Sequence, residues 1–389
     1  MKVLIVQIIG SYIDADVELV LNKMGHHTEW LDAKKFRGND LYVNDALERL
    51  LEEKIVKRKY DAVYSANFFP LLANRCHETD MVYLAWHYDT PPHLPTMQHM
   101  DYPTNHIFFF NRKDYEYYAG KGLESVHFLP LAVNTKRLTA LKQDRRFDTQ
   151  ISFVGQLYQS TLPALRNNMN SYDSGWVDGL IQAQRQVYGE YFIPDLITEE
   201  RLDSISKNLL EKKMISESLD PRQLAYSMAT YLTYLDRVSL LSLLSERYQT
   251  DLYSERFDGT EKELLEKVRY RGTVDYGTQM PLVFRQSKIN LCPILRSNEH
   301  AIPLRALDVM GSGGLLMANY QSGLAEFFEN GKELIMYADI QEAVMQVEYL
   351  LSHEEERVKI AQRGFERMEN DFGYEDRIRK MLKVSGLSA

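Results

Sequence analysis

The first third of the chain alternates between short apolar runs and amphipathic stretches. KVLIV (2–6) is a continuous apolar run, typical of a strand buried on both faces, and further strand candidates are HTEWL (27–31), DAVYSA (61–66), MVYLAW (81–86), HIFFFN (106–111) and SVHFLP (125–130). Helical spacing of apolar residues is found between them, over 14–25, 44–59 and 113–122. Gly25 is expected to cap the first of these helices. Strands that alternate with helices predict βαβ units and a parallel sheet.

The pattern changes twice after residue 131. A charged stretch over 131–148 predicts a linker, and TQISFVG (149–155) predicts the first strand of a second domain. From about 160 to 247 the chain has long helical patterns and few strand signals, which predicts a helical insertion.

Strand and helix patterns return after the insertion. Strands are expected at TDLYS (250–254), KINLCPI (288–294) and GLLMA (314–318), with helices at MPLVFRQS and PLRALDVMG and three helical segments at the end. We therefore predict a first domain over 1–147, a second over 148–373, and a C-terminal helix, 374–389, that returns to the first domain.

Composition narrows the class of protein. A chain of 389 residues favours two domains. Its net charge of −9 argues against a general nucleic-acid binder. Cys76 and Cys292 are too few for a disulfide framework and favour a reducing compartment. The apolar start is interrupted by acidic residues from Asp14 onward, and no apolar run is long enough to span a bilayer, so a cytoplasmic location is expected.

Several common catalytic motifs are missing from the sequence. It contains no GxxxxGK[ST], HExxH, GxSxG or CxxC, and no GxGxxG follows the first strand. The glycines Gly311, Gly313 and Gly314 follow a helix and precede a strand, which is the reverse of the dinucleotide-binding order. A hydrolase or a dehydrogenase therefore has little support.

The stretch IPLRALDVMGSGGLLM (302–317) places two charges in an apolar helical pattern. Pro303 suits the first turn of a helix that would begin beyond the carboxyl end of the strand KINLCPI. Helix N-termini at this edge of an α/β sheet bind anions. Arg305 in the first turn would hold a phosphate, and Asp308 would accept hydrogen bonds from a ribose diol. An internal ion pair between Arg305 and Asp308 fits the same spacing.

This stretch and the sequence that follows it resemble the C-terminal domain of the bacterial CgeB-type glycosyltransferases. These enzymes share the GT-B architecture with the large retaining group called family 4. The similarity continues through GKELIMYADI and EEERVKIAQRG, and upstream through ISFVG, YRGTVDY, SKINLCP, AWHYDTPP and VHFLPLAVN. It implies an α/β fold with two Rossmann-like domains that face a cleft.

The resemblance also implies site residues. In the family, two glutamates eight positions apart grip the donor sugar and its ribose. Asp308 matches the second, whereas His300 stands at the first and Glu299 is one position out of register. With histidine at the first position, His300 or the backbone through Ala301 and Ile302 would replace the usual sugar contact.

The resemblance places further donor contacts on other segments. Gly155 and Gln156 match a loop near the diphosphate, and Arg305 is the preferred phosphate ligand. YRGTVDY would lie near the base, with Val274 and Tyr276 as contacts, although apolar packing also explains Val274. Further basic candidates outside clear register are Arg166, Arg271 and Lys288.

The stretch WHYDTPP (86–92) follows a predicted strand and would lie at the carboxyl edge of the first sheet. His87 or Asp89 would orient an acceptor hydroxyl or contact the donor sugar, as catalytic candidates beside Arg305. The alternative is that Asp89 caps the proline-rich turn and His87 is a packed polar residue. His93 and His99 have no acidic neighbours, so no metal site is expected.

The sequence therefore predicts a hexosyltransferase-type glycosyltransferase. The nucleotide-diphosphate sugar would bind to the C-terminal domain and a glycan, protein or small-molecule acceptor to the N-terminal one. Retention is implied by the family, and neither a cofactor nor an obligatory metal is expected. The alternatives are a nucleotide-sugar epimerase or another enzyme of this architecture, and a non-catalytic nucleotide-sugar-binding subunit, which His300 in place of glutamate favours. The base, sugar, acceptor and oligomeric state are not encoded in any recognised motif.

Overall fold

The computed structural model describes residues 1–36, 40, 42–56, 60–92, 94, 96–141 and 148–388, without the side chain of residue 56. Contacts divide the chain into two compact units. The first unit holds Met1–Thr135, His300–Leu307 and Met368–Ala389, and the second holds Lys136–Glu299 and Asp308–Arg367. The predicted domain bounds, including the boundary at residue 147, stay predictions.

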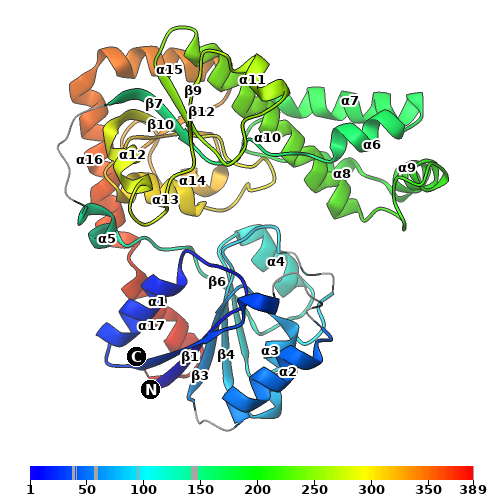
Figure 1. Cartoon of the computed structure of the whole chain (residues 1–389), viewed down its shortest axis with the longest axis vertical. Helices are drawn as coiled ribbons and strands as arrows, with labels where there is room; N and C mark the ends of the chain where they lie inside the picture. The colour runs from blue at the N-terminus through cyan, green and yellow to red at the C-terminus, as the bar shows by residue number, and fades with distance from the viewer. Residues whose placement is uncertain are drawn as a thin grey trace. The chain divides into compact units, whose positions relative to one another are not determined.

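The first unit is built on a parallel sheet of six strands in the order β2-β1-β3-β4-β5-β6 (Figure 1). These strands are β1 (Lys2–Gln7), β2 (His27–Asp32), β3 (Ala62–Ala66), β4 (Val82–Trp86), β5 (Asn105–Phe109) and β6 (Val126–Phe128). All five residues of β3 are buried, as expected for a strand covered on both faces. The strand order reverses between β1 and β3, and open α/β sheets bind ligands beyond the carboxyl ends of strands at such a point.

Helices pack on this sheet, and the C-terminal helix is among them. They are α1 (Asp14–Lys23), α2 (Asp45–Leu51), the π-helical turn η2 (Glu52–Val56), α3 (Pro70–Glu78), α4 (Arg112–Gly120) and α17 (Tyr374–Val384), with a short 3₁₀ helix, η1 (Lys34–Phe36). α1 ends as predicted, because Gly25 has φ +85° and the N–H of His26 donates to the Leu21 carbonyl. α17 packs on α1, and Lys23 Nζ lies 2.8 Å from Glu375 Oε2.

The second unit contains another parallel sheet of six strands, in the order β12-β11-β10-β7-β8-β9. Its strands are β7 (Thr149–Val154), β8 (Thr250–Tyr253), β9 (Arg269–Gly272), β10 (Ser287–Cys292), β11 (Leu316–Asn319) and β12 (Ile335–Tyr337). The order reverses between β7 and β10, which is the arrangement of a dinucleotide-binding fold. Its helices are α11 (Thr260–Leu264), α12 (Met280–Gln286), α14 (Ser322–Phe327) and α15 (Ile340–Ser352), together with most of α16 (Glu354–Asp371) and the second half of α13 (Leu304–Gly311). Two parallel sheets with helices confirm the predicted α/β fold.

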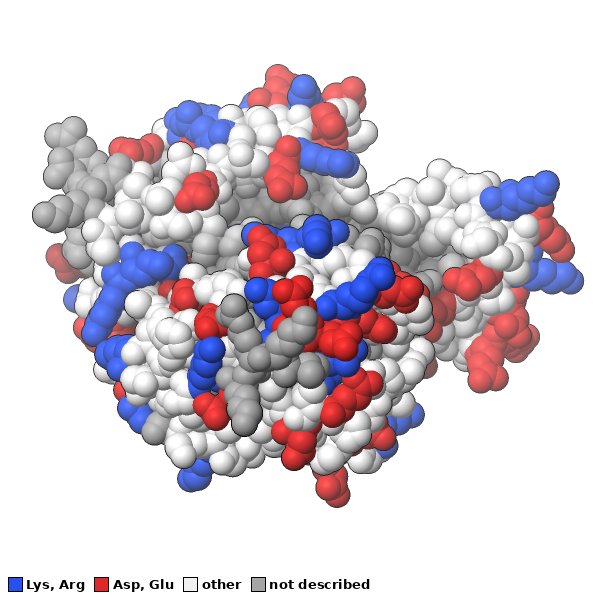
Figure 2. Space-filling model, turned by 60° about the horizontal axis from the view of Figure 1, so that its bottom comes forward, with Lys and Arg blue, Asp and Glu red and all other residues white. Residues whose placement is uncertain are grey.

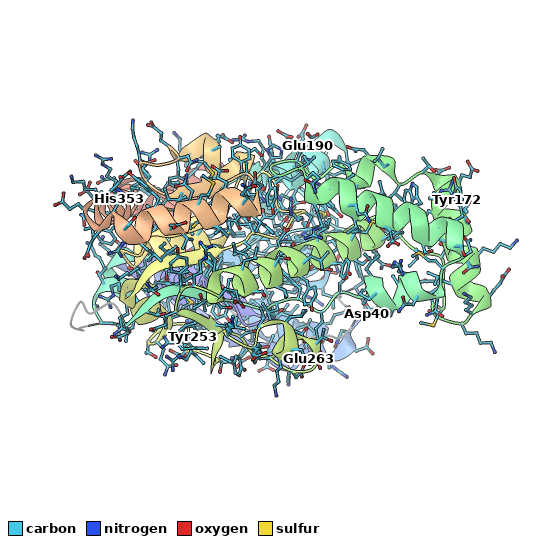
Figure 3. The ribbon with its side chains drawn as sticks, turned by 90° about the horizontal axis from the view of Figure 1, so that it is seen from above. Asp40, Tyr172, Glu190, Tyr253, Glu263 and His353 are labelled. Atoms are coloured by element: carbon cyan, nitrogen blue, oxygen red, sulfur yellow. The ribbon has the colours of Figure 1, made fainter. Side chains whose placement is uncertain are left out.

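The helical insertion lies between β7 and β8. It consists of α6 (Leu162–Asn168), α7 (Ser171–Arg185), α8 (Ile193–Leu196), α9 (Glu199–Glu211) and the long α10 (Pro221–Ser245). These helices bury an apolar core of their own, which includes Val177, Ile205 and Met228. α10 packs on α6, α7 and α8 and also on α15, so it joins the insertion to the helices of the sheet. Figure 3 shows Tyr172, in α7, and His353, after α15, at opposite ends of this unit.

Some elements were not predicted from the pattern. α3 begins with the apolar run PLLA, and the edge strand β9 reads RYRG, so neither has the expected period. β12 has only three residues. The helix expected over 44–59 becomes α2 and then η2, and residues 57–59 lie outside the described part of the chain. The predicted linker contains a short helix, α5 (Thr135–Thr139), and its residues 142–147 are not described.

The surface charge and the lengths of the helices complete the description of the fold. On the face that Figure 2 shows, Lys and Arg side chains are interspersed with Asp and Glu. Phosphate backbones are bound by clustered positive charge, and the interspersed charges of this face do not offer it. Within the described ranges, no helix combines the length and the apolar character needed to cross a membrane.

Candidate functional site

His87 occupies the carboxyl edge of the first sheet, directly after β4. Its side chain is only 2% exposed and its ring stacks on that of Phe109, with the ring centroids 4.6 Å apart. Neither ring nitrogen has a hydrogen-bond partner among the described residues. Burial lowers the pKa of His87 to about 3. The imidazole is therefore neutral at neutral pH, and it is able to donate or accept a hydrogen bond but carries no charge.

Asn67 fixes the loop that follows His87. It has φ +63°, a left-handed conformation that asparagine tolerates. Its Nδ2 donates to Asp89 Oδ2 at 2.7 Å, and its Oδ1 accepts from the N–H of Tyr88 at 3.1 Å. The Tyr88 hydroxyl donates to the Gly10 carbonyl at 2.9 Å. Asp89 is thus bonded to the loop after β3, and the loops after β1, β3 and β4 form one hydrogen-bonded edge.

The loop after β7 is held in an unusual conformation in the second unit. Gly155 has φ +158°, and a Cβ there would lie 3.3 Å from the Phe153 ring. The next carbonyl, that of Gln156, accepts a hydrogen bond from Arg237 Nη1. Tyr158 has φ +68°, and its ring lies 4.5 Å from the Arg237 guanidinium. Left-handed backbone at a non-glycine residue persists only where neighbouring contacts enforce it. Here Arg237 provides those contacts.

Two arginines that sequence reasoning missed tie α10 to the loop after β10. Arg237 donates to the Pro293 carbonyl from Nε at 3.1 Å and from Nη2 at 2.7 Å. Arg296, which is 4% exposed, pairs with Asp236 through Nε at 2.6 Å and Nη2 at 3.1 Å. The signal in the sequence was the charged pair Asp236–Arg237 in the middle of an apolar helical pattern. These contacts fix the two loops that flank the β7/β10 reversal.

Asp308 lies in α13 and is 1% exposed. Its Oδ1 accepts a hydrogen bond from the Tyr276 hydroxyl at 3.0 Å. The Arg137 guanidinium lies 5.5 Å from the centre of the Tyr276 ring. The structure therefore brings together two of the predicted donor contacts, Asp308 and Tyr276, from segments 32 residues apart.

Further donor candidates lie on the β9 segment, in the insertion and in β10. Arg271 Nε lies 3.3 Å from Asp251 Oδ2, and its side chain is 44% exposed. Val274 is half-buried. The basic candidate Arg166 pairs with Asp178 inside the insertion, and Lys288 stands at the amino end of β10. Lys288 is thus at the opposite end of its strand from the edge where a donor is expected.

The segment before α13 belongs, by its contacts, to the first unit. The His300 carbonyl accepts from the N–H of Arg112 at 3.1 Å, while Ala301 and Ile302 are buried. Arg305 lies in the first turn of α13, as predicted, and is half-buried. Pro303 stands just before this helix and not within it, and its carbonyl accepts from the N–H of Ala306 at 2.9 Å.

Glu299 is buried and forms hydrogen bonds with two other segments of the second unit. It is 4% exposed, and its carboxylate accepts a hydrogen bond from the N–H of Tyr191 in the insertion. Its carbonyl accepts from the N–H of Gly323 at 3.0 Å and from the Ser322 hydroxyl at 2.9 Å. These contacts fasten the loop after β10 to the insertion and to α14.

A cavity of about 840 Å³ adjoins the β7 loop in the second unit. Gln156, Tyr158 and Gln159 line one side, and residues of α10 line another. The charged residues in its lining are Glu255, Arg256, Asp258 and Glu261. Three carboxylates against one guanidinium suit a neutral group better than a diphosphate.

The described residues contain no cluster of three or more His, Cys, Asp or Glu side chains able to hold a metal ion. Residue His93 of the histidine-rich stretch lies outside those residues. His99 stacks on Tyr102, with the ring centroids 5.2 Å apart. Independence of the reaction from a metal stays a prediction.

Comparison with known proteins supports the class of enzyme. Residues 237–383 match the model of a family described as glycosyl transferase-like. This match begins within α10 and includes the β9 segment, the loop after β10 and α13. Among proteins with curated functions, none matches the sequence.

Solved structures of the same architecture extend over the whole chain. A glycosyltransferase from Rickettsia africae is 12% identical with a TM-score of 0.61, and 99% of this chain aligns with 97% of it. Sucrose-phosphate synthase from Thermosynechococcus elongatus is 11% identical with a TM-score of 0.58, over 99% and 98% of the two chains. Alr3699/HepE of Anabaena, in complex with UDP and glucose, is 10% identical with a TM-score of 0.57, over 99% of each.

Identities this low establish the architecture and not the substrate. The fold is that of the GT-B glycosyltransferases, with two parallel sheets and helices. Together with the family match, it confirms the predicted class: the chain is an enzyme of the glycosyltransferase type, with a glycosyl transferase-like domain over residues 237–383.

Proposed function

We propose that this protein transfers a hexose from a nucleotide-diphosphate sugar to an acceptor hydroxyl, with retention of configuration and without an obligatory metal. The observation that carries the donor assignment is the buried Asp308 carboxylate, oriented by the Tyr276 hydroxyl at 3.0 Å. A charged acceptor fixed in one orientation suits the two hydroxyls of a ribose. UDP is the nucleotide to test first, because HepE, of the same architecture, was solved with UDP and with UDP-glucose.

The proposed division of roles follows the two sheet edges. Arg305 in the first turn of α13 stabilises the diphosphate, which gains negative charge as the bond to the sugar breaks. The departing phosphate oxygen takes the proton of the acceptor hydroxyl while the new glycosidic bond forms on the same face, so no protein base is required. His87, as a neutral imidazole, donates or accepts one hydrogen bond with the sugar or the acceptor. The closer relationship to the CgeB-type enzymes is part of this proposal.

A panel of UDP-, GDP-, ADP- and TDP-hexoses, incubated with the purified protein, tests the function. We expect slow release of the nucleoside diphosphate from one donor, faster release with a suitable acceptor, and turnover that persists in EDTA. Donor binding without release or transfer would support the nucleotide-sugar-binding subunit instead, which His300 at the glutamate position favours. Interconversion of two nucleotide sugars would indicate an epimerase.

A further inference from the structure

A second cavity lies at the opposite edge of the second sheet from the proposed donor site. Its volume is about 580 Å³, which is within the range of small-molecule sites. Ser287 and Lys288 at the start of β10, and Leu315 just before β11, form one part of its wall. His87 follows the carboxyl end of β4, and Arg305 and Asp308 follow that of β10, so this cavity does not belong to the proposed donor site.

The charged residues of its lining are all basic. They are Arg285 at the end of α12, Lys288 in β10 and Arg357 in α16, and no lining residue is acidic within the described part of the chain. This contrasts with the cavity beside Gln156, where carboxylates predominate. The cavity therefore favours an anion.

Arg357 carries a buried positive charge. Its side chain is only 2% exposed, and burial lowers the pKa of its guanidinium, an effect that Glu354 partly offsets. Nη1 lies 3.4 Å from the Lys288 carbonyl, and Nη2 lies 3.7 Å from Glu354 Oε1, on a side chain that is 67% exposed. An anion in the cavity would gain more from this desolvated cation than from one in water.

Lys288 adds a second cation to the same wall. The side chain is half-buried, and within the described part of the chain no carboxylate pairs with its ammonium group. A half-buried ammonium group without a carboxylate partner is a ready ligand for a phosphate oxygen.

The rest of the lining offers hydrogen bonds and an apolar surface. Thr139, Gln286 and Gln362 supply hydroxyl and amide groups, and Val358, Ala361 and Phe365 form a continuous side of α16. Inorganic anions need no such surface, whereas the sugar or base of an organic phosphate packs well on it.

From this juxtaposition we infer a second ligand site, which binds a phosphate ester at the amino edge of the second sheet. Its phosphate lies among Arg285, Lys288 and Arg357, and its organic part lies against α16. The inference does not depend on the proposed transfer reaction. The shared chemistry is that of a sugar phosphate or a nucleotide monophosphate, and the experiment separates these two sources.

Calorimetric titration with ribose 5-phosphate, AMP and inorganic phosphate tests the site in the full-length protein. We expect one of the two esters to bind at least tenfold more tightly than inorganic phosphate. Lys288→Met should weaken that ester about tenfold, because one charge-assisted contact is lost. Lys359→Met is the matched control, since Lys359 is exposed on the same helix, α16, and does not line the cavity.

Donor-site variants keep this test separate from the proposed function. Arg305→Ala should leave ester binding unchanged while it weakens UDP, and Lys288→Met should do the reverse. The inference is overturned if neither ester binds, if inorganic phosphate binds equally well, or if Lys288→Met and Lys359→Met behave alike. Loss of ester binding in Arg305→Ala would place the ester in the donor site and would also overturn it.

Discussion

The donor assignment is tested most directly at Asp308. In Asp308→Asn, the amide oxygen can still accept from Tyr276, so the side chain keeps its orientation and only the charge toward the ribose is lost. Hydrogen bonds to charged groups contribute about 1.5–3 kcal/mol and neutral ones about 0.5–1.5. At one or two ribose hydroxyls the difference is about 1–3 kcal/mol. Because Asp308 is only 1% exposed, solvent screens this difference little.

The expected result is UDP binding about 5- to 150-fold weaker than in the unchanged protein, measured by calorimetry. UDP lacking both ribose hydroxyls provides the second arm. The unchanged protein should bind it more weakly than Asp308→Asn binds UDP, because the hydrogen bonds to the carboxylate are lost completely, and Asp308→Asn should weaken binding of this analogue much less than it weakens binding of UDP. Tyr276→Phe controls for orientation alone, since it removes the 3.0 Å bond and keeps the carboxylate. Equal affinity of a folded Asp308→Asn for UDP would refute the assignment and favour a purely structural carboxylate.

Three further predictions concern other residues. Arg305→Ala should lower turnover and weaken UDP binding, whereas His87→Ala should lower turnover with UDP binding nearly intact; calorimetry beside a transfer assay checks both, and the opposite pattern would contradict the division of roles. The pKa of His87 is lowered to about 3, so below pH 6.5 the unfolded state takes up a proton that the folded state does not, and the free energy of unfolding falls with pH by up to about 1.4 kcal/mol per pH unit. In urea denaturation between pH 6 and 4, His87→Gln should reduce this dependence of the unfolding free energy on pH, and an unchanged dependence would contradict burial of the neutral ring. Asp236→Ala leaves the buried Arg296 without its carboxylate partner and should lower the free energy of unfolding by about 3–5 kcal/mol, whereas Asp178→Ala, in an exposed pair, should lower it by less than about 1 kcal/mol. Similar melting temperatures for the two variants would refute this.

The sequence predicted correctly those elements in which burial imposes a regular pattern of apolar residues. Strands covered on both faces must be apolar throughout, which is why KVLIV and AVYSA could be recognised as β1 and β3. Gly25 could be identified as a helix cap because the left-handed conformation there favours glycine. Short or exposed elements lack such constraints, and β9 and β12 were missed for that reason.

In the candidate site, the sequence pattern identified individual residues but not the contacts between them. Arg305 and Asp308 were found because a charge in an apolar helical pattern needs an explanation, and the pattern alone could place both in one helix. It could not reveal that Tyr276 holds the Asp308 carboxylate, because that contact joins segments 32 residues apart. Nor could it show that Asn67 orients Asp89, or that Arg237 holds the loop after β7.

The sequence by itself determined the α/β class, the helical insertion and the motif that carries Arg305 and Asp308, because local periodicity and spacing record which faces are buried. Only the tertiary structure determined which partner lies next to each charged or polar side chain. It set Asp236 against Arg296 and buried His87 on Phe109. It also placed Lys288 beside Arg357 at the amino edge of the sheet, which is opposite the edge where a donor is expected. Those partners come from distant parts of the chain, and the free energy of a charge depends on the partners and the solvent around it rather than on its neighbours in sequence.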